Sequence, residues 1–312
     1  MAADYPAATV PVRTTATHRR RGGTPASDPL VWASALVALA LLLPLAFLVL
    51  EAASFGWSAV GPLVFRGLTA SLLWHTVGLT AAVTACCAVI GTGAAWCVER
   101  TDLPGRRLWA ALVVVPVGIP DFAVAFGWRS LFAGMGGFGG ALLVMTLAVY
   151  PLVFLPVAAS LRDADPGQEE VARSLGAGRL ATFWRVTVGQ ARTAILGGCL
   201  LVALVVLAEY GAFEILGYQT FTTEIFTQLH TGFDTDAAAA LSLVLVVAGL
   251  VVLAGEGVSR GHGRASRVGP AAARASRHRL GQWRLPALGG LAVLVAAALG
   301  VPVVAVVYWL AH

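Results

Sequence analysis

The sequence predicts an all-α polytopic membrane protein, and three observations carry that prediction. Of the 312 residues, 58% are hydrophobic and only 12% are charged, whereas a soluble domain usually carries about 25% charged residues. The chain contains apolar runs about as long as the ~20 residues that a helix needs to cross a bilayer. These runs are continuously apolar rather than alternating, so they favour helices over the strands of a membrane barrel.

In chain order the apolar runs are Leu30–Leu50, Gly67–Val98, Leu108–Trp128, Phe138–Leu161, Thr193–Leu216, Ala237–Gly255 and Leu285–Leu310. The first run is too long for a signal-peptide core, so we expect a retained membrane anchor. The second is longer than one crossing needs and fits a tilted helix. The third is interrupted by Pro116, Pro120 and Asp121, and the fifth is charged only toward its end, by Glu209 and Glu214. Together the runs predict six core spans plus a seventh.

The arginines predict the orientation of these spans. All 21 basic residues are arginine, and all but Arg66 and Arg129 lie in the polar arm 1–29 or in the loops Glu99–Arg107, Arg162–Arg192 and Ser259–Arg284. Cytosolic loops of membrane proteins carry the excess of basic residues. We therefore expect a multi-pass protein of the bacterial inner membrane with a cytosolic N-terminus. The C-terminus of this chain would then be extracytoplasmic.

The residue types that are missing exclude several kinds of chemistry. The chain has no lysine, and a Walker A loop or a Schiff-base enzyme needs one, so the chain is not expected to hydrolyse ATP itself. Its four cysteines lie in or at the ends of apolar runs without metal-ligand spacing, and we interpret them as small packing residues. No HExxH or GxSxG motif supports a membrane-embedded enzyme. No catalytic, cofactor or metal site is expected in this chain.

The loop Arg162–Arg192 contains a short polar helix between two long apolar runs. Asp165 and Pro166 form a strong helix start, because Asp accepts hydrogen bonds from the free N–H groups of the first turn and Pro suits the first helical position. Gly176 is a natural stop. A well-capped amphipathic helix at this place suggests that another protein docks there; the alternative is a solvated connector.

The side chains of this helix fall on distinct faces. Glu169 and Glu170 lie near the positive end of the helix dipole. Val171 and Leu175 are four residues apart and share a face. A second turn-rich segment follows and adds Phe183. Two short helices are therefore expected to project acidic and apolar groups from the cytosolic side.

The spacing within this loop resembles a known motif. Glu170-Val171-Ala172, three residues, Gly176, nine residues and then Val186-Thr187-Val188-Gly189 is similar to the EAA loop of ABC-importer permeases. That loop reads Glu-Ala-Ala, three residues, Gly, nine residues, Ile, any residue, Leu-Pro. Val171 replaces the first Ala, and Gly189 replaces the Pro, which would loosen the turn into the fifth span. We call Arg162–Arg192 the coupling loop, after the family's coupling helices.

The resemblance extends over Gly67–Ser259, which is most of the chain. The further matching segments, similar to ferric-iron-type permeases, are Thr101–Trp109, Val117–Phe122, Leu207–Gly211 and Ile215–Thr223. The resemblance implies the helical bundle of a type I ABC importer, in which one set of six spans packs against a second set. Small residues such as Gly91, Gly93 and Ala94 would let the helices approach closely.

The resemblance also implies the partners. A cytosolic ABC ATPase dimer would use ATP and Mg, an extracytoplasmic binding protein would deliver the substrate, and a second permease half or a second copy would complete the path. The residues implied to couple to the ATPase are Glu169, Glu170, Val171, Ala172, Leu175, Gly176 and Phe183. The implied substrate is ferric iron, with thiamine or a sulfate-like anion as alternatives. A membrane scaffold that only recruits a partner is the alternative from another class.

Charged residues within the apolar runs are candidates for the translocation path. An ionisable group in a span is costly and usually faces an interior path or a partner. Asp121, Glu209 and Tyr210 are therefore predicted to line the path and tolerate a cation. The alternative for Asp121 is a structural ion pair with Arg129, which lies eight residues further along.

The domain organisation follows from these segments. We expect a polar N-terminal arm at 1–29, a permease core at 30–258 with the coupling loop, a basic linker at 259–284, and the seventh span at 285–312. His278 lies in the linker and reads as solvated, and the linker's arginines would attract anionic membrane lipid rather than nucleic acid. The EAA spacing occurs once, so we expect the chain to be the amino-terminal half of a two-half permease, truncated or split, plus one helix.

Overall fold

A computed structural model describes residues 29–55, 66–164, 166–260 and 278–311. The chain divides into two compact units, Met1–Phe47 and Leu48–His312. Helix α1 (Pro29–Phe55) runs across the boundary between them and contains Pro44. None of its apolar window Val31–Glu51 is buried, and its length and composition suit a membrane crossing. The first predicted span is therefore confirmed as a helix, whereas most of the predicted N-terminal arm lies outside the described residues.

The second unit is built of helices throughout its described part. They are α3 (Gly67–Arg100), α4 (Arg106–Val114), η2 (Val115–Gly118), α5 (Asp121–Leu131), α6 (Gly137–Val149), α7 (Pro151–Arg162), α8 (Pro166–Ser174), α9 (Arg179–Thr182), η3 (Phe183–Thr187), α10 (Val188–Ala208), α11 (Gly211–Leu216), α12 (Phe221–His230), α13 (Thr235–Arg260), η4 (Gly281–Trp283), α14 (Arg284–Val295), η5 (Ala296–Gly300) and α15 (Val301–Ala311). The predicted all-α class is confirmed. Among the described residues, β pairing is confined to a single bridge between Thr101 and His278.

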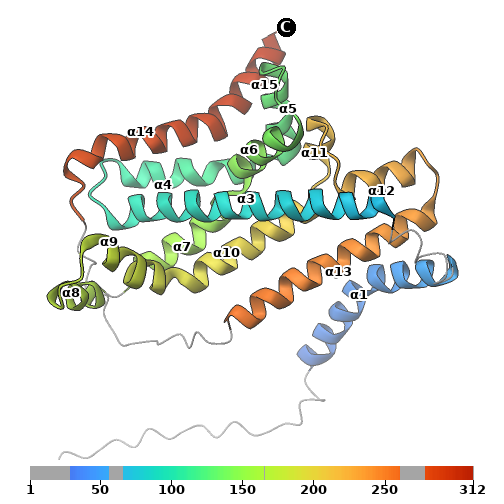
Figure 1. Cartoon of the computed structure of the whole chain (residues 1–312), viewed down its shortest axis with the longest axis horizontal. Helices are drawn as coiled ribbons and strands as arrows, with labels where there is room; N and C mark the ends of the chain where they lie inside the picture. Colours follow the sequence, from blue (N-terminus) through green and yellow to red (C-terminus); the bar gives the residue numbers. More distant parts are fainter. Residues whose placement is uncertain (1–28, 56–65, 165, 261–277, 312) are drawn as a thin grey trace, which may run out of the picture. The chain divides into compact units, whose positions relative to one another are not determined.

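The core forms where α3 and α10 pack against α7 (Figure 1). Glycines make this approach close. A Cβ on Gly91 of α3 would lie 2.8 Å from the Cβ of Val153, and a Cβ on Gly198 of α10 would lie 2.7 Å from the Cα of the same residue. The expectation of close approach is confirmed for Gly91, whereas a Cβ on Gly93 would meet nothing within 4 Å.

The third predicted span is not one straight helix. It consists of Arg106–Gly118 and Asp121–Leu131, which meet at an angle of 94°. Pro120 causes the break: it has no N–H to continue the helix, and it forces the preceding residue, Ile119, into an extended conformation with φ −93° and ψ 127°. The described residues thus contain six helices long and apolar enough to cross a membrane, or seven when this bent pair counts as one span.

The fifth predicted span has different limits from those expected. Its helix begins ten residues earlier, at Phe183, where the π-helical turn η3 continues directly into α10, and it ends at Ala208. Glu209 is extended, with φ −72° and ψ 136°, and α11 starts two residues later. The acidic residue that was expected inside a helix therefore lies at a helix break.

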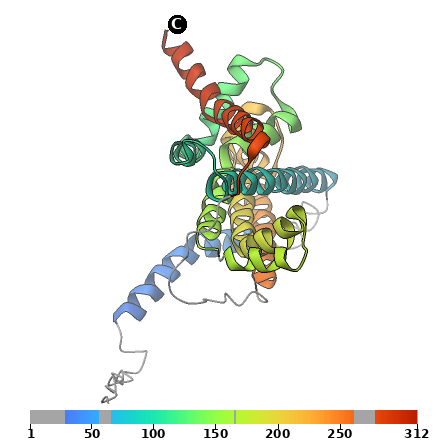
Figure 2. The ribbon, with the colours of Figure 1, turned by 90° about the vertical axis from the view of Figure 1, so that its left-hand side faces the viewer.

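The seventh apolar run is helical from Arg284 to Ala311 and packs into the second unit. Its helices α14 and α15 bury Leu291 and Ala305. At the contact between α15 and α5, a Cβ on Gly127 would lie 3.0 Å from the Cα of Pro302. The end of α3, the helices α8 and α9 and the start of α14 meet at one end of the unit, which faces the viewer in Figure 2. Most described loop arginines gather at this end, as the orientation rule expects, although the side of the membrane that it faces stays a prediction.

Candidate functional site

Helix α8 forms the first half of the coupling loop, and its limits follow from its sequence. Pro166 is its first residue, and the predicted cap Asp165 lies outside the described residues. Gly176 has φ +84°, a left-handed conformation that glycine adopts without strain. The N–H of Gly176 donates to the carbonyl of Arg173 (2.9 Å), and the N–H of Ala177 donates to that of Ala172 (3.0 Å). The predicted helix stop is confirmed.

The outer face of α8 is apolar and open. Leu175 is 82% exposed and Val171 is 58% exposed. Both line a groove of about 890 Å³ between α8 and the start of α10, together with Ala172 and Gly189. Glu170 is also exposed. This exposed apolar surface is suited to contact with another protein, and docking there stays a prediction.

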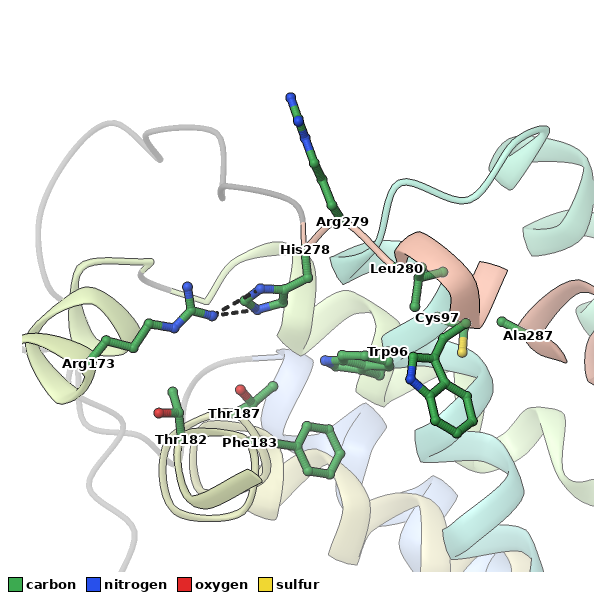
Figure 3. A pocket seen from close by; sticks show the side chains of 11 residues that line it. Trp96, Cys97, Arg173, Thr182, Phe183, Thr187, His278, Arg279, Leu280 and Ala287 are labelled. Atoms are coloured by element: carbon green, nitrogen blue, oxygen red, sulfur yellow. Dashed lines mark hydrogen bonds between the residues drawn. The ribbon is translucent and has the colours of Figure 1, made fainter. Parts of the chain in front are cut away.

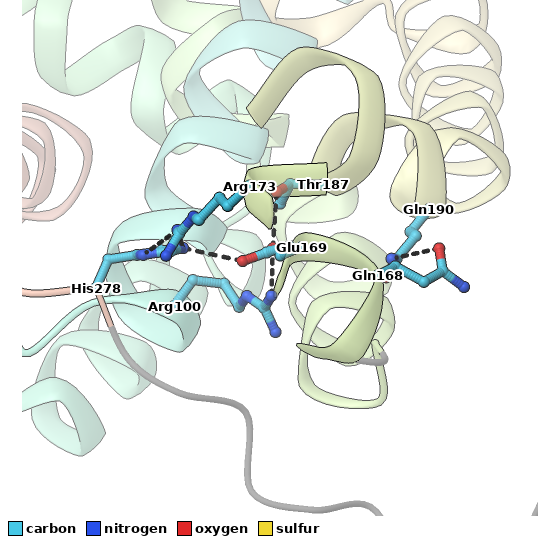
Figure 4. Close-up of polar contacts among 7 residues, drawn as sticks. All are labelled: Arg100, Gln168, Glu169, Arg173, Thr187, Gln190 and His278. Atoms are coloured by element: carbon cyan, nitrogen blue, oxygen red, sulfur yellow. Dashed lines mark hydrogen bonds and ion pairs between the residues drawn. The ribbon is translucent and has the colours of Figure 1, made fainter. Parts of the chain in front are cut away.

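Glu169 points the opposite way and is only 4% exposed. Its Oε1 accepts hydrogen bonds from Nη2 of Arg100 and from Oγ1 of Thr187 (2.9 Å), and its Oε2 lies 3.1 Å from Nε2 of His278 (Figure 4). Burial alone raises the pKa of Glu169, but the hydrogen bonds with His278, Thr187 and Arg100 outweigh that effect and lower the pKa to about 2. Glu169 therefore stays ionised and anchors α8 to three other segments.

His278 is not solvated, and that expectation was wrong. Its side chain is 17% exposed and contacts two residues of α8. Nη2 of Arg173 donates to Nδ1 of His278 (3.0 Å), and Nε2 of His278 contacts Glu169. Its backbone pairs with the end of α3, donating to the carbonyl of Arg100 (2.9 Å) and accepting from the N–H of Asp102 (3.2 Å). We call His278–Leu280 the clip, since it joins α3, α8 and the start of the last span.

Arg100 was expected in the loop Glu99–Arg107, but it belongs to a helix. It ends α3 and is 1% exposed. Within the described residues its Nε and Nη1 have no hydrogen-bond partner, so its charge is balanced by Glu169 alone. Phe183 is half-buried as well, with its ring edge-on to Trp96 at 5.5 Å. Of the residues predicted to couple to the ATPase, Glu169 and Phe183 thus face the bundle. Glu170, Val171 and Leu175 face outward.

The predicted path residues meet at the two helix breaks. Asp121 is the first residue of α5, and Glu209 precedes α11 and accepts a hydrogen bond from the N–H of Ala212 (2.7 Å). A Cβ on Gly211 would lie 3.1 Å from the Cβ of Phe122, which shows how closely these helix starts approach. The carboxyl groups of Asp121 and Glu209 are half-buried and close enough to interact electrostatically. The N-terminal ends of their helices favour negative charge.

The remaining residues around this pair are aromatic and hydroxyl-bearing. Tyr210 stacks on Phe226, with ring centroids 3.9 Å apart, and Thr222 donates to the carbonyl of Glu209 (2.5 Å). Arg129 instead donates to the carbonyl of Met135 (2.7 Å), and no ion pair joins it to Asp121 in the described part of the chain. The structural-pair alternative for Asp121 is therefore not realised here. Across the described residues, no group of three or more His, Cys, Asp or Glu could hold a metal ion.

Comparisons with known proteins agree on one family. The family model described as "Binding-protein-dependent transport system inner membrane component" matches residues 88–255. The chain is 35% identical over 277 residues to the Fe(3+)-transport system permease protein FbpB 2 of Haemophilus influenzae, which covers 88% of this chain. It spans only 55% of that relative's length. It is also 31% identical to the sulfate transport system permease protein CysT of Salmonella typhimurium, over 70% of this chain and 86% of the relative.

Solved structures share the fold. A bacterial alginate ABC transporter in complex with a periplasmic protein matches with a TM-score of 0.58 at 14% identity, over 77% of this chain and 96% of the other. The MetNI methionine ABC transporter in an inward-facing conformation matches with a TM-score of 0.54 at 18% identity, over 64% of this chain and the whole of the other.

Proposed function

The chain belongs to the family of binding-protein-dependent transport system inner membrane components, the permeases of ABC importers, and on this premise we propose that it conducts ferric iron. The iron would arrive on an extracytoplasmic binding protein, and a cytosolic ATPase would drive the transport. The chain contributes a path and a coupling surface rather than an enzyme site. Because this chain spans only 55% of the iron-transporting relative's length, the complete path is proposed to need a second set of spans.

The observation that carries the choice of substrate is the pair of carboxyl groups at the helix breaks. Asp121 and Glu209 are half-buried, and two carboxylates in a site of low dielectric attract a cation and repel an anion. This supports iron over a sulfate-like anion. Sulfate remains the second candidate, because the sulfate permease of Salmonella typhimurium matches over 86% of its own length.

The coupling surface is proposed to work through two faces of α8. The outer face, with Val171 and Leu175, would dock on the ATPase. The inner face, with Glu169, would pass its displacement to the end of α3 and to the clip, because those contacts are buried and hydrogen-bonded. Access would then alternate between the two sides of the membrane as nucleotide binds and leaves.

The proposal is tested by reconstitution. Liposomes would contain the chain, its partner permease half and the ATPase, with iron-loaded binding protein on the outside. We expect binding-protein-stimulated ATP hydrolysis and iron uptake with ferric iron and no uptake with sulfate. Uptake of sulfate instead would assign the second candidate. Co-purification of the ATPase without any stimulated hydrolysis would favour a scaffold.

The path is tested at the carboxyl pair. Asp121→Asn and Glu209→Gln each remove one negative charge from a half-buried position, so each is expected to lower iron uptake at least about tenfold, which corresponds to about 1.4 kcal/mol in the barrier. The matched control is Asp234→Asn, which removes a charge from an exposed position before α13 and keeps the side-chain oxygen that accepts from the N–H of Ala237. The path assignment fails if both pair variants transport iron normally at wild-type expression.

A further inference from the structure

A cavity lies where the coupling loop, the end of α3 and the start of the last span meet. Its volume is about 570 Å³, within the range of about 300–1,000 Å³ that small-molecule sites occupy. Most of its wall is apolar, formed by Trp96 from α3, Phe183 from η3 and Leu280 from the clip. Figure 3 shows the rings of Trp96 and Phe183 close together in this wall. Thr187 and His278, which contact Glu169, also belong to its lining, so the cavity adjoins the anchor of α8.

The rim of the cavity is positively charged. Arg173 and Arg279 belong to its lining, and neither takes part in an ion pair within the described residues. The guanidinium of Arg173 reaches His278, which can only accept from it at Nδ1, and Arg279 extends outward from the rim (Figure 3). The nearby carboxylate, Glu169, already balances the buried Arg100. An anion at the rim would therefore meet two arginines whose charges are not neutralised.

The position of the cavity relates it to the membrane. Trp96 and Cys97 lie in the last turns of the candidate span Gly67–Arg100, and Trp283 and Ala287 lie in the first turns of Gly281–Ala311. Tryptophan at the end of a span is typical of the interface between lipid and water. Trp283 is 66% exposed and Leu285 is 80% exposed, so this side of the cavity adjoins an apolar outer surface.

From this combination we infer that the cavity binds an anionic phospholipid. The phosphate binds at the rim beside Arg173, the exposed side chain of Arg279 turns toward it, and the start of one acyl chain covers Trp96, Phe183 and Leu280. A free phosphate would contact the arginines but not the apolar wall. A zwitterionic lipid would contact the wall but would neutralise less of the positive charge of the arginines. The bound lipid joins α8 to the last span beside the clip. The inference does not depend on which substrate, if any, the chain transports.

The test measures protection of Cys97, which lines the cavity. A chain with Cys86, Cys87 and Cys199 replaced by Ala keeps Cys97 as its single thiol, and its labelling by a maleimide is followed in detergent. Phosphatidylglycerol is expected to slow the labelling in a saturable manner. Phosphatidylcholine and inorganic phosphate at equal concentration are not. Equal protection by phosphatidylcholine or by phosphate overturns the inference, since it indicates unspecific shielding or a free-anion site.

Variants separate the cavity from general attraction to the basic loops. Arg173→Gln with Arg279→Gln is expected to weaken phosphatidylglycerol protection about 30-fold, equivalent to about 2 kcal/mol for two arginines near an anionic headgroup. Ala287→Trp fills the cavity without a change of charge and is expected to abolish the protection. The matched control, Arg185→Gln with Arg192→Gln, removes the same charge from exposed positions outside the cavity. The inference is overturned if the control loses as much phosphatidylglycerol protection as Arg173→Gln with Arg279→Gln. It is also overturned if that double variant and Ala287→Trp both keep full protection.

Discussion

Two adjacent glutamates in α8 have opposite environments. Successive residues of a helix point about 100° apart, so only one of the pair can face the bundle. Glu169 does so and is the partner of a buried arginine, whereas Glu170 is exposed. The motif spacing begins at Glu170, but the contact that holds the coupling loop to the spans is made by its neighbour. The two positions therefore predict different phenotypes.

Glu169→Gln is expected to lower the stability of the chain by about 3 kcal/mol, because it leaves the buried guanidinium of Arg100 without a counter-charge. Glu170→Gln, at an exposed position, is expected to change stability by less than about 0.5 kcal/mol. Thermal unfolding of both variants in detergent, followed by circular dichroism at pH 7, measures the difference. Equal melting temperatures for the two variants would contradict the anchoring role of Glu169.

The stabilisation by Glu169 has a defined pH dependence. Its pKa is lowered from 4.5 to about 2 in the folded chain, so the unfolded chain binds the proton first as the pH falls. The stabilisation is then fully present above about pH 4.5 and is lost as the pH falls toward about 2. The difference in melting temperature between wild type and Glu169→Gln should stay constant from about pH 5 to 7 and shrink below that. A difference that changes mainly between about pH 5 and 7 would contradict control by Glu169.

The sequence predicts the helix stop at Gly176 and the exposed pair Val171 and Leu175, because capping and helical spacing are local properties. It does not predict the anchor. Arg100 and His278 contact Glu169 across 69 and 109 residues, and no local pattern distinguishes a buried arginine at the end of a span from a solvated one in a loop.

At the scale of elements, the sequence predicts where the helices lie better than where they bend. Pro120 and Asp121 were recognised as interruptions of the third run, but the 94° bend depends on the tertiary contacts that hold α5 against α11 and α15. The break at Glu209 has no proline and gave no comparable signal. Its cause is the hydrogen bond from the N–H of Ala212 to the glutamate, together with close packing of Gly211 on Phe122.

The packing of α3 and α10 on α7 predicts a graded response to substitution of their glycines. Gly91→Leu or Gly198→Leu forces a side chain into the backbone of α7 around Val153 and is expected to destabilise the chain by more than about 2 kcal/mol. Gly93→Leu should cost less than about 1 kcal/mol, because a Cβ there meets nothing within 4 Å. Thermal unfolding in the same detergent measures all three. A cost for Gly93→Leu as large as that for Gly91→Leu would place the close contact elsewhere.

At the scale of the whole molecule, the chain combines one coupling loop with the candidate spans of an importer permease. The chain matches 55% of the length of the iron-transporting relative and 86% of the length of a sulfate-transporting one. It is therefore similar both to a much longer permease and to one of about its own length. The last span packs on α5 and is joined to α8 by the clip. Movement of the coupling loop would therefore reach both the bent third span and the last span. The sequence predicted the last span, but not that the clip before it contacts the coupling loop.

The apolar outer face of α8 gives the most direct test of assembly with an ATPase. Leu175→Arg places a charge on a side chain that is 82% exposed, so the isolated chain should melt as wild type does, because the substitution disturbs no buried contact. Loss of an apolar anchor at the centre of an interface is expected to reduce co-purified ATPase at least about tenfold, or about 1.4 kcal/mol. Phe233→Arg is the matched control, since Phe233 is 85% exposed and lies in the loop between α12 and α13, away from the coupling loop. If Leu175→Arg still retains the ATPase, the docking surface does not lie on α8. If both variants lose the ATPase, any added charge disrupts assembly and the effect is not specific to this face.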